Sequence, residues 1–286
     1  NFFLFRYAES HTSVIFFGAA LLYGVGFLTM CLRVKEGEYP PPEPVTREKF
    51  TPFAYVSTFF RECFSHRLFR LVFAYSATVG FATSIGTFYI FMELSIGLDL
   101  DQIGKISGGA FFVGMLLMYP MGVLIDRFHP LRVMMAGIIG YCFAVSFKLV
   151  FLVHEFPKSV AFWIYASAVL IAIPVNSATA SASLPMVMRL FPHERFGQFC
   201  AANAMSGAAG TIAGGFSAGL FLDSLKTFFP QSDYYYRFVP AWSAVFMLLA
   251  LFFILLVFRE WKKLGGDSGF KPPIEDKFEN FHNIKH

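Results

Sequence analysis

Seven long apolar runs dominate this sequence, and each is long enough to cross a lipid bilayer. A helix needs about 20 apolar residues to cross roughly 30 Å of hydrocarbon, because it rises only about 1.5 Å per residue. Charged residues make up only 15% of the chain, whereas a soluble domain carries about a quarter. We therefore predict an all-α, multi-pass membrane protein with seven transmembrane helices. They lie near residues 11–33, 68–96, 103–126, 131–153, 159–190, 196–222 and 238–260.

The cysteines and histidines indicate neither a disulfide framework nor a metal site. The four cysteines have no paired spacing, and the seven histidines are dispersed through loops and tails. No glycine-rich loop of the kind that cradles phosphates is present either. We predict no catalytic residue, no cofactor, no metal and no nucleic-acid partner, so the chain is not expected to be an enzyme.

The basic residues predict an orientation. If the connector Gly122–Arg132 is cytoplasmic, so are the connector 34–67, the turn 189–195 and the tail after Arg259. All but six of the 23 lysines and arginines then lie on that side, as the positive-inside rule requires. We expect a cell-membrane protein whose first helix runs inward and whose C-terminus is cytoplasmic.

The first connector is the longest one. Its prolines (Pro40, Pro41, Pro42 and Pro44) predict an extended, non-helical segment, because proline lacks an N–H and has a fixed φ. After Pro52, apolar residues recur at helical spacing, which favours a short helix on the inner membrane surface, with an ordinary polar loop as the alternative. The tail after residue 264 is polar and expected to be loosely ordered.

Two connectors on the predicted inner side carry charged motifs. The stretch from Gly122 through Asp126 and Arg127 to Arg132 resembles the G-x-x-x-D-R-x-x-x-R loop of the major facilitator superfamily, with one additional residue before the last arginine. The turn Pro192–Gly197 resembles that family's P-x-x-R-x-G element. In that family a long cytoplasmic connector follows the sixth helix, so the resemblance implies that these helices are the sixth to twelfth of a twelve-helix transporter.

That resemblance implies a domain organisation. Residues 1–33 would be the last helix of the N-terminal bundle with its outer lead-in, and 34–67 the cytoplasmic linker. Residues 68–264 would be the C-terminal six-helix bundle, and 265–286 a cytoplasmic tail. The chain opens on Asn1 rather than Met, and we interpret it as a fragment whose N-terminal half is missing.

A narrower resemblance concerns the proline-rich connector and the aromatic-rich helices. Both are similar to glycoside–pentoside–hexuronide:cation symporters and to sucrose:proton symporters. This resemblance implies secondary active transport of a small polar solute such as a sugar, by alternating access and with H⁺ or Na⁺ as the coupling cation.

The charged motifs are candidates for the gate of such a transporter. A carboxylate or arginine at a helix end can hold one conformation through contacts of roughly 0.3–1 kcal/mol each, which is the size a reversible latch needs. The alternative for the arginines is anchoring to lipid phosphates. The candidate gating residues are Gly122, Asp126, Arg127, Arg132 and Arg195.

Polar side chains on the apolar helices are candidates for the solute cavity. Tyr75, Tyr89 and Glu93 share one face of the second helix at 100° per residue, and Asn176 and Thr179 share a face of the fifth. Pro174 and Pro185 are expected to interrupt the fifth helix, as at many transport sites. Asn203 belongs to a stripe of small residues on the sixth helix that favours close packing. The alternative for Tyr75, Asn176 and Thr179 is hydrogen bonding between helices.

Two charged residues lie within the apolar runs, Glu93 and Lys148. Intramembrane charges are often functional, but both residues are near the outer surface, so their side chains are expected to reach the headgroups. A seven-helix receptor or a non-transport membrane protein remains the alternative. Three features argue against a receptor. The first connector is long, no cysteine lies at the outer start of the third helix, and the last helix has no Asn-Pro-x-x-Tyr element.

Overall fold

The computed structural model describes residues 4–33, 52–230 and 232–273, and every regular element in these ranges is a helix. The chain divides into two units, residues 1–56 and 57–286. The first unit holds α1 (Leu4–Arg33), whose large apolar side chains, such as Phe16, Leu22 and Tyr23, are exposed. A helix that is apolar on all sides needs lipid or partner helices around it. The proline-rich residues 34–51 lie outside the described residues.

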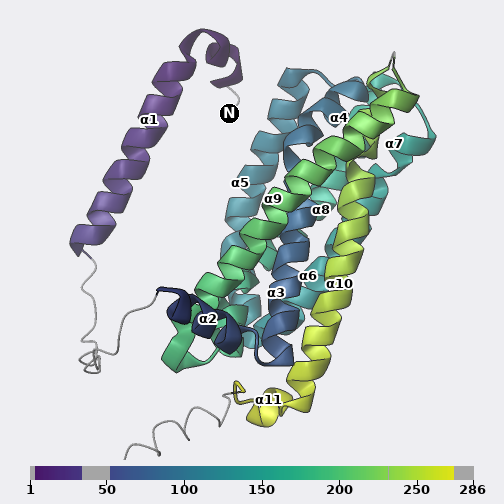
Figure 1. The fold of residues 1–286 in the computed structure, drawn as a ribbon. Coiled ribbons are helices and arrows are strands. Elements are labelled where there is room, and N and C mark those ends of the chain that lie inside the picture. Colours follow the sequence, from purple (N-terminus) through teal and green to yellow (C-terminus); the bar gives the residue numbers. More distant parts are fainter. Residues whose placement is uncertain (1–3, 34–51, 231, 274–286) are drawn as a thin grey trace, which may run out of the picture. The chain divides into compact units, whose positions relative to one another are not determined.

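The second unit is a bundle of long helices that run side by side (Figure 1). Its main elements are α3 (Arg67–Thr83), α5 (Leu100–Arg127), α6 (Pro130–Lys148), α8 (Lys158–Leu190), α9 (Phe196–Phe228) and α10 (Val239–Lys263). Shorter elements complete it: η1 (Ser84–Phe88), α4 (Tyr89–Ser95), α7 (Val150–Val153), η2 (His193–Arg195), η3 (Asp233–Phe238) and α11 (Gly266–Gly269).

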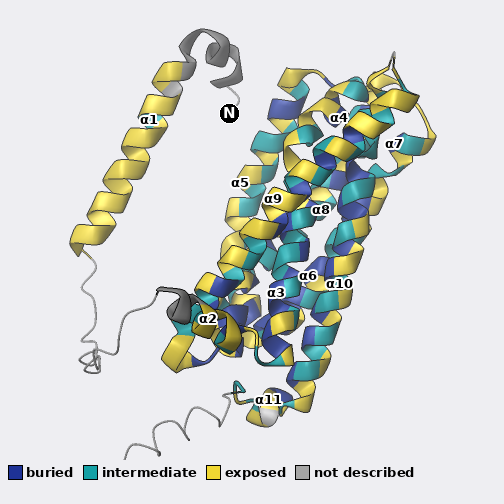
Figure 2. Cartoon of the chain, viewed as in Figure 1, coloured by how far each residue is buried: buried dark blue, intermediate teal, exposed yellow. Residues whose placement is uncertain are grey.

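Seven helical segments of the described chain are long and apolar enough to cross a membrane, and they confirm the seven predicted spans. They are Phe16–Arg33, Arg67–Ser95, Leu100–Arg127, Pro130–Val153, Lys158–Leu190, His193–Phe228 and Asp233–Lys263. Large apolar side chains such as Phe111, Phe216 and Trp163 remain more than two-thirds exposed. Figure 2 shows the buried residues gathered between the helices and the exposed ones on their outward faces. This distribution fits a bundle whose solvent is lipid.

The two ends of the bundle carry different elements (Figure 1). The loop end, as we call it, carries the connectors Gly122–Arg132 and Pro192–Gly197 together with α2 (Pro52–Cys63) and α11. The far end carries α4 and α7. A helix after Pro52 was predicted and is present as α2; its position on a membrane surface stays a prediction.

The prediction that prolines interrupt the fifth span was wrong. Pro174 and Pro185 lie inside α8, which is helical from Lys158 to Leu190. The irregular backbone is instead in the second span, which changes to a 3₁₀ helix at Ser84. There the Thr83 hydroxyl donates to the Val79 carbonyl at 3.0 Å and the Ser84 hydroxyl to the Phe81 carbonyl at 2.7 Å. Hydrogen bonds from Ser and Thr hydroxyls to backbone carbonyls compete with the helical hydrogen bonds and bend helices. A proline inside a transmembrane helix is tolerated because neighbouring helices satisfy the backbone groups that it leaves free.

Close packing of α3 against α9 depends on glycines, as the stripe of small residues on the sixth span predicted. A Cβ atom at Gly210 would lie 2.0 Å from the Ala77 carbonyl oxygen, and one at Gly214 would lie 2.7 Å from the Phe81 Cα. A Cβ atom at Gly80 would lie 2.4 Å from the Gly207 carbonyl oxygen. Backbones can approach this closely only where side chains are absent.

The expectation of a loosely ordered tail was wrong for its first residues. Gly265 has a φ of +108°, a conformation open mainly to glycine, and it ends α10 so that the chain turns into α11. Phe270 then packs against the core cluster at the loop end. Residues 274–286 lie outside the described part of the chain.

Candidate functional site

A cavity of about 590 Å³ lies between α5 and α8. It extends from Ser107 to Met118 on α5 and from Val169 to Ala180 on α8, which is the middle of both helices. Its walls are mainly apolar, with Gly114, Met115, Ala172 and Ile173 among them, and Asn176 and Ser177 add polar groups. A cavity of this size with a few polar groups is typical of a site for a small solute.

Lys148 is the only ionisable residue among those that line this cavity in the described structure. It is the last residue of α6, and its side chain reaches the part of the cavity nearest the far end. The ammonium Nζ lies 4.6 Å from the centroid of the Tyr89 ring and 4.9 Å from that of Tyr165. A cation held over two aromatic faces gains about 0.5–2 kcal/mol from each, depending on how dry the site is.

Glu93 contacts one of these two tyrosines. Its side chain is only 7% exposed, and the Tyr165 hydroxyl donates a hydrogen bond to its Oε1. The hydroxyl of Tyr89 is 3.3 Å from the Ser243 Oγ on α10. We call Tyr89, Glu93, Lys148 and Tyr165 the tyrosine–lysine cluster; its members come from α4, α6 and α8.

The expectation that Glu93 and Lys148 reach the outer headgroups was wrong. Glu93 is buried, and the Lys148 amine lies over the two tyrosine rings. The physical reason is that the rings and the Tyr165 hydroxyl solvate the charges inside the bundle. Tyr165 is 72 positions from Glu93 in the sequence, and no sequence signal paired the two residues.

Five of the six cavity candidates do not line this cavity, and three of these five have their contacts elsewhere in the bundle. Tyr75 is 6% exposed and belongs to the core cluster at the loop end. Asn203 accepts a hydrogen bond of 2.6 Å from the Ser76 hydroxyl, which joins α9 to α3. The Thr179 hydroxyl donates within α8, to the carbonyls of Val175 and Asn176, both at 3.1 Å. Of the other three, Asn176 lines the cavity, while Tyr89 and Glu93 adjoin it through Lys148.

The candidate gating residues divide into two groups at the loop end. Arg132 forms an ion pair with Asp267 of α11. Arg195 pairs with Glu62 of α2 at 2.7 Å, and the Gln198 amide donates to the same carboxylate at 2.9 Å. Asp126 and Arg127 are exposed, and within the described part of the chain neither forms an ion pair. Sequence reasoning did not identify Glu62 and Asp267 as partners.

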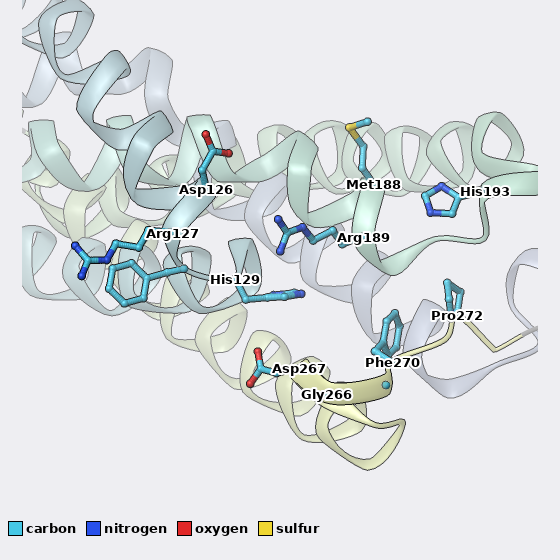
Figure 3. A pocket seen from close by; sticks show the side chains of 12 residues that line it. Asp126, Arg127, His129, Met188, Arg189, His193, Gly266, Asp267, Phe270 and Pro272 are labelled. Carbon is cyan, nitrogen blue, oxygen red and sulfur yellow. The ribbon is translucent and has the colours of Figure 1, made fainter.

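A second cavity, of about 640 Å³, opens at the loop end. Asp126, Arg127 and Arg189 line it on one side and residues of the tail on the other, and Figure 3 shows Asp126 and Arg127 pointing away from each other. A Cβ atom at Gly122 would meet nothing within 4 Å, so no described residue requires a glycine there.

His129 also lines the loop-end cavity, and Figure 3 shows its ring between Arg189 and Asp267. Its Nδ1 accepts the Leu131 N–H at 3.2 Å and so caps the start of α6. Its ring centroid lies 4.5 Å from that of Trp261. Burial, with a further contribution from the positive charge of Arg189, lowers the pKa of the His129 imidazole below its ordinary value.

A comparison with known protein families gives one match. The model of the family described as the Major Facilitator Superfamily matches residues 71–279. No curated protein and no solved structure matches the chain.

Proposed function

Since the chain belongs to the major facilitator superfamily, a family of membrane transporters, we propose that it is part of a secondary active transporter for a small polar solute. The observation that carries this proposal is the cavity between α5 and α8, halfway along both helices. A solute site at the bilayer midplane lets the same residues be reached from either side as two bundles rock.

The second half of the transport path would come from another six-helix bundle of the same protein, to which α1 would belong. Exposed apolar residues on the cavity side of the second unit, such as Phe111 and Met115, support this assignment because they leave that side open. The wall of the cavity would then be completed by helices of the other bundle.

A sugar-like solute fits the polar groups of the cavity. The Asn176 amide offers both a donor and an acceptor, and the Ser107 and Ser177 hydroxyls offer more. A hydroxylated solute can satisfy such groups, while the apolar walls contact the carbon faces of the sugar.

Coupling to H⁺ or Na⁺ would involve Glu93. A buried carboxylate inside a membrane span is costly and is commonly retained for ion or proton movement. Its hydrogen bond from Tyr165 and its position next to Lys148 connect it to the solute cavity. Binding of solute at Lys148 would therefore change the electrostatic potential at the nearby Glu93 carboxylate.

The loop end would be the gate, and we place it, like the C-terminus, in the cytoplasm of a cell-membrane transporter. The ion pairs Arg132–Asp267 and Arg195–Glu62 would hold the gate elements of this bundle together. Asp126 and Arg127 have no ion pair within the described chain and would contact the other bundle in one of the two conformations.

The test is solute uptake by the full natural chain reconstituted in liposomes, with a proton or sodium gradient imposed. Uptake that accumulates solute against its gradient is expected, and Glu93→Gln is expected to abolish accumulation while leaving downhill exchange. An exposed acid, Asp101, provides the matched control Asp101→Asn. If Glu93→Gln accumulates solute normally, Glu93 is not the coupling residue; if no tested solute enters at all, the transporter assignment fails.

A further inference from the structure

The position of Lys148 defines the chemical class of the solute: we propose that the solute carries a carboxylate, which binds the Lys148 ammonium in the cavity between α5 and α8. This inference rests on the proposed transport function and narrows it. A sugar acid, or another hydroxylated organic acid of similar size, fits this description better than a neutral sugar.

The first argument is the charge of the cavity. Among the described residues that line it, Lys148 is the only ionisable one, and the others are apolar or uncharged, such as Met118, Ile173 and Asn176. A charge beside walls of low polarity is screened less than a charge on a fully hydrated surface, so it exerts a stronger field. The cavity therefore favours an anion over a neutral molecule of the same shape.

The second argument is that the hydrogen-bonding capacity of the ammonium is not used. Among the described residues, no hydrogen bond and no ion pair within 4.0 Å involves Lys148; its contacts are the faces of the Tyr89 and Tyr165 rings. An ammonium group has three N–H donors. The rings hold the cation in place by attraction to its charge, and they leave the donors available to a ligand in the cavity.

The third argument concerns Glu93, the nearest countercharge. It does not line the cavity, and its Oε1 already accepts a hydrogen bond from Tyr165. Glu93 is buried against the Tyr165 hydroxyl, whereas Lys148 is among the residues that line the cavity. Lys148 can consequently attract a second carboxylate without breaking the contact between Glu93 and Tyr165.

Discrimination against neutral solutes follows from the same geometry. A neutral sugar that fills the cavity displaces water from the ammonium and offers only weak acceptors in return. Leaving a buried charged group without a partner carries a large penalty, and sites built in this way reject ligands that lack the matching group. The carboxylate thus contributes to selectivity as well as to binding.

The experiment compares matched acid and neutral solutes in liposomes that contain the full natural chain. Each pair differs only by a carboxylate in place of a hydroxymethyl group: glucuronate and glucose, gluconate and sorbitol, lactate and propane-1,2-diol. We expect at least one acid to enter at least tenfold faster than its neutral partner. Lys148→Gln should raise the KM of that acid at least tenfold, and Lys148→Arg, which keeps the charge, should restore part of the uptake.

The control variant is Lys226→Gln, which removes an exposed lysine near the far-end terminus of α9 and should leave uptake unchanged. Elution as a single species in detergent establishes that each variant is folded. Equal uptake of acids and neutral partners, uptake of neutral solutes alone, or normal acid uptake by Lys148→Gln would overturn the inference while leaving the transport function intact. If no member of any pair enters, the inference and the proposed function both fail.

Discussion

The hydroxyl of Tyr165 donates a hydrogen bond to the buried carboxylate of Glu93, and this contact joins α8 to α4 inside the bundle. The two residues are 72 positions apart in the sequence. Together with Lys148 and Tyr89 they place opposite charges within one small region next to the solute cavity. The contact therefore bears on the stability of the bundle and on the proposed transport. Substitutions can distinguish the two effects.

Tyr165→Phe removes the hydroxyl and leaves the Glu93 carboxylate without this donor. Loss of one partner from a buried polar pair costs about 1–3 kcal/mol, so the unfolding temperature in detergent should fall measurably. Tyr89→Phe is the matched control, since the 3.3 Å contact of the Tyr89 hydroxyl is to the neutral Ser243 and is weaker. Equal thermal stability of the two variants would contradict the importance of the Tyr165–Glu93 bond.

Gly210→Ala should disrupt the packing of α3 against α9. The added Cβ would lie 2.0 Å from the Ala77 carbonyl oxygen, and a backbone atom gives way less easily than a flexible side chain. Overpacking of this kind typically costs about 1–3 kcal/mol. Thermal unfolding in detergent measures the effect, with Gly219→Ala as the control because a Cβ there meets nothing within 4 Å. A Gly210→Ala protein as stable as the control would show that the helices are not packed this closely.

Asp126→Asn should change transport without changing stability. Asp126 is exposed and forms no ion pair within the described chain, so its substitution should alter the free energy of unfolding by less than about 0.5 kcal/mol. If its partner is the other bundle, the balance between inward-open and outward-open states should shift. Cysteine labelling from each side of the membrane measures that balance in the full chain, and an unchanged balance with an unchanged uptake rate removes the gating role.

Acid should destabilise the loop end through His129. Burial lowers the pKa of this imidazole in the folded state, so the unfolded chain binds the proton more readily. The stability that the neutral ring contributes is present above about pH 6.5, its ordinary pKa, and is lost as the pH falls through the lowered value. Protonation also removes the Nδ1 acceptor that caps α6, and it adds a cation close to Arg189.

The measurement is the unfolding temperature in detergent between pH 8 and pH 5. His129→Asn keeps a side chain that can cap the helix but removes the titrating group. Its unfolding temperature should fall less at low pH than that of the natural protein. Parallel pH profiles for the two proteins would show that His129 does not cause the acid sensitivity.

The sequence by itself determined the all-α class, the seven spans and the charged connectors at the loop end. These features depend on local properties: the length of an apolar run against the thickness of a bilayer, and the presence of charges where the run ends. The stripe of small residues on α9 could be predicted from the sequence for the same reason, since residues four apart lie on one face of a helix.

Only the tertiary structure decided which polar residues meet. Asn176, Thr179 and Asn203 were all candidates for the cavity, but Asn203 is held by Ser76 of a neighbouring helix and Thr179 bonds within its own. Lys148 turns inward because the fold brings Tyr89 and Tyr165 beside it, and Glu93 does so because Tyr165 of α8 is brought beside it. Helical periodicity gives the direction in which a side chain points on its own helix, but its partner depends on which helices pack together, and that arrangement is set by the whole bundle.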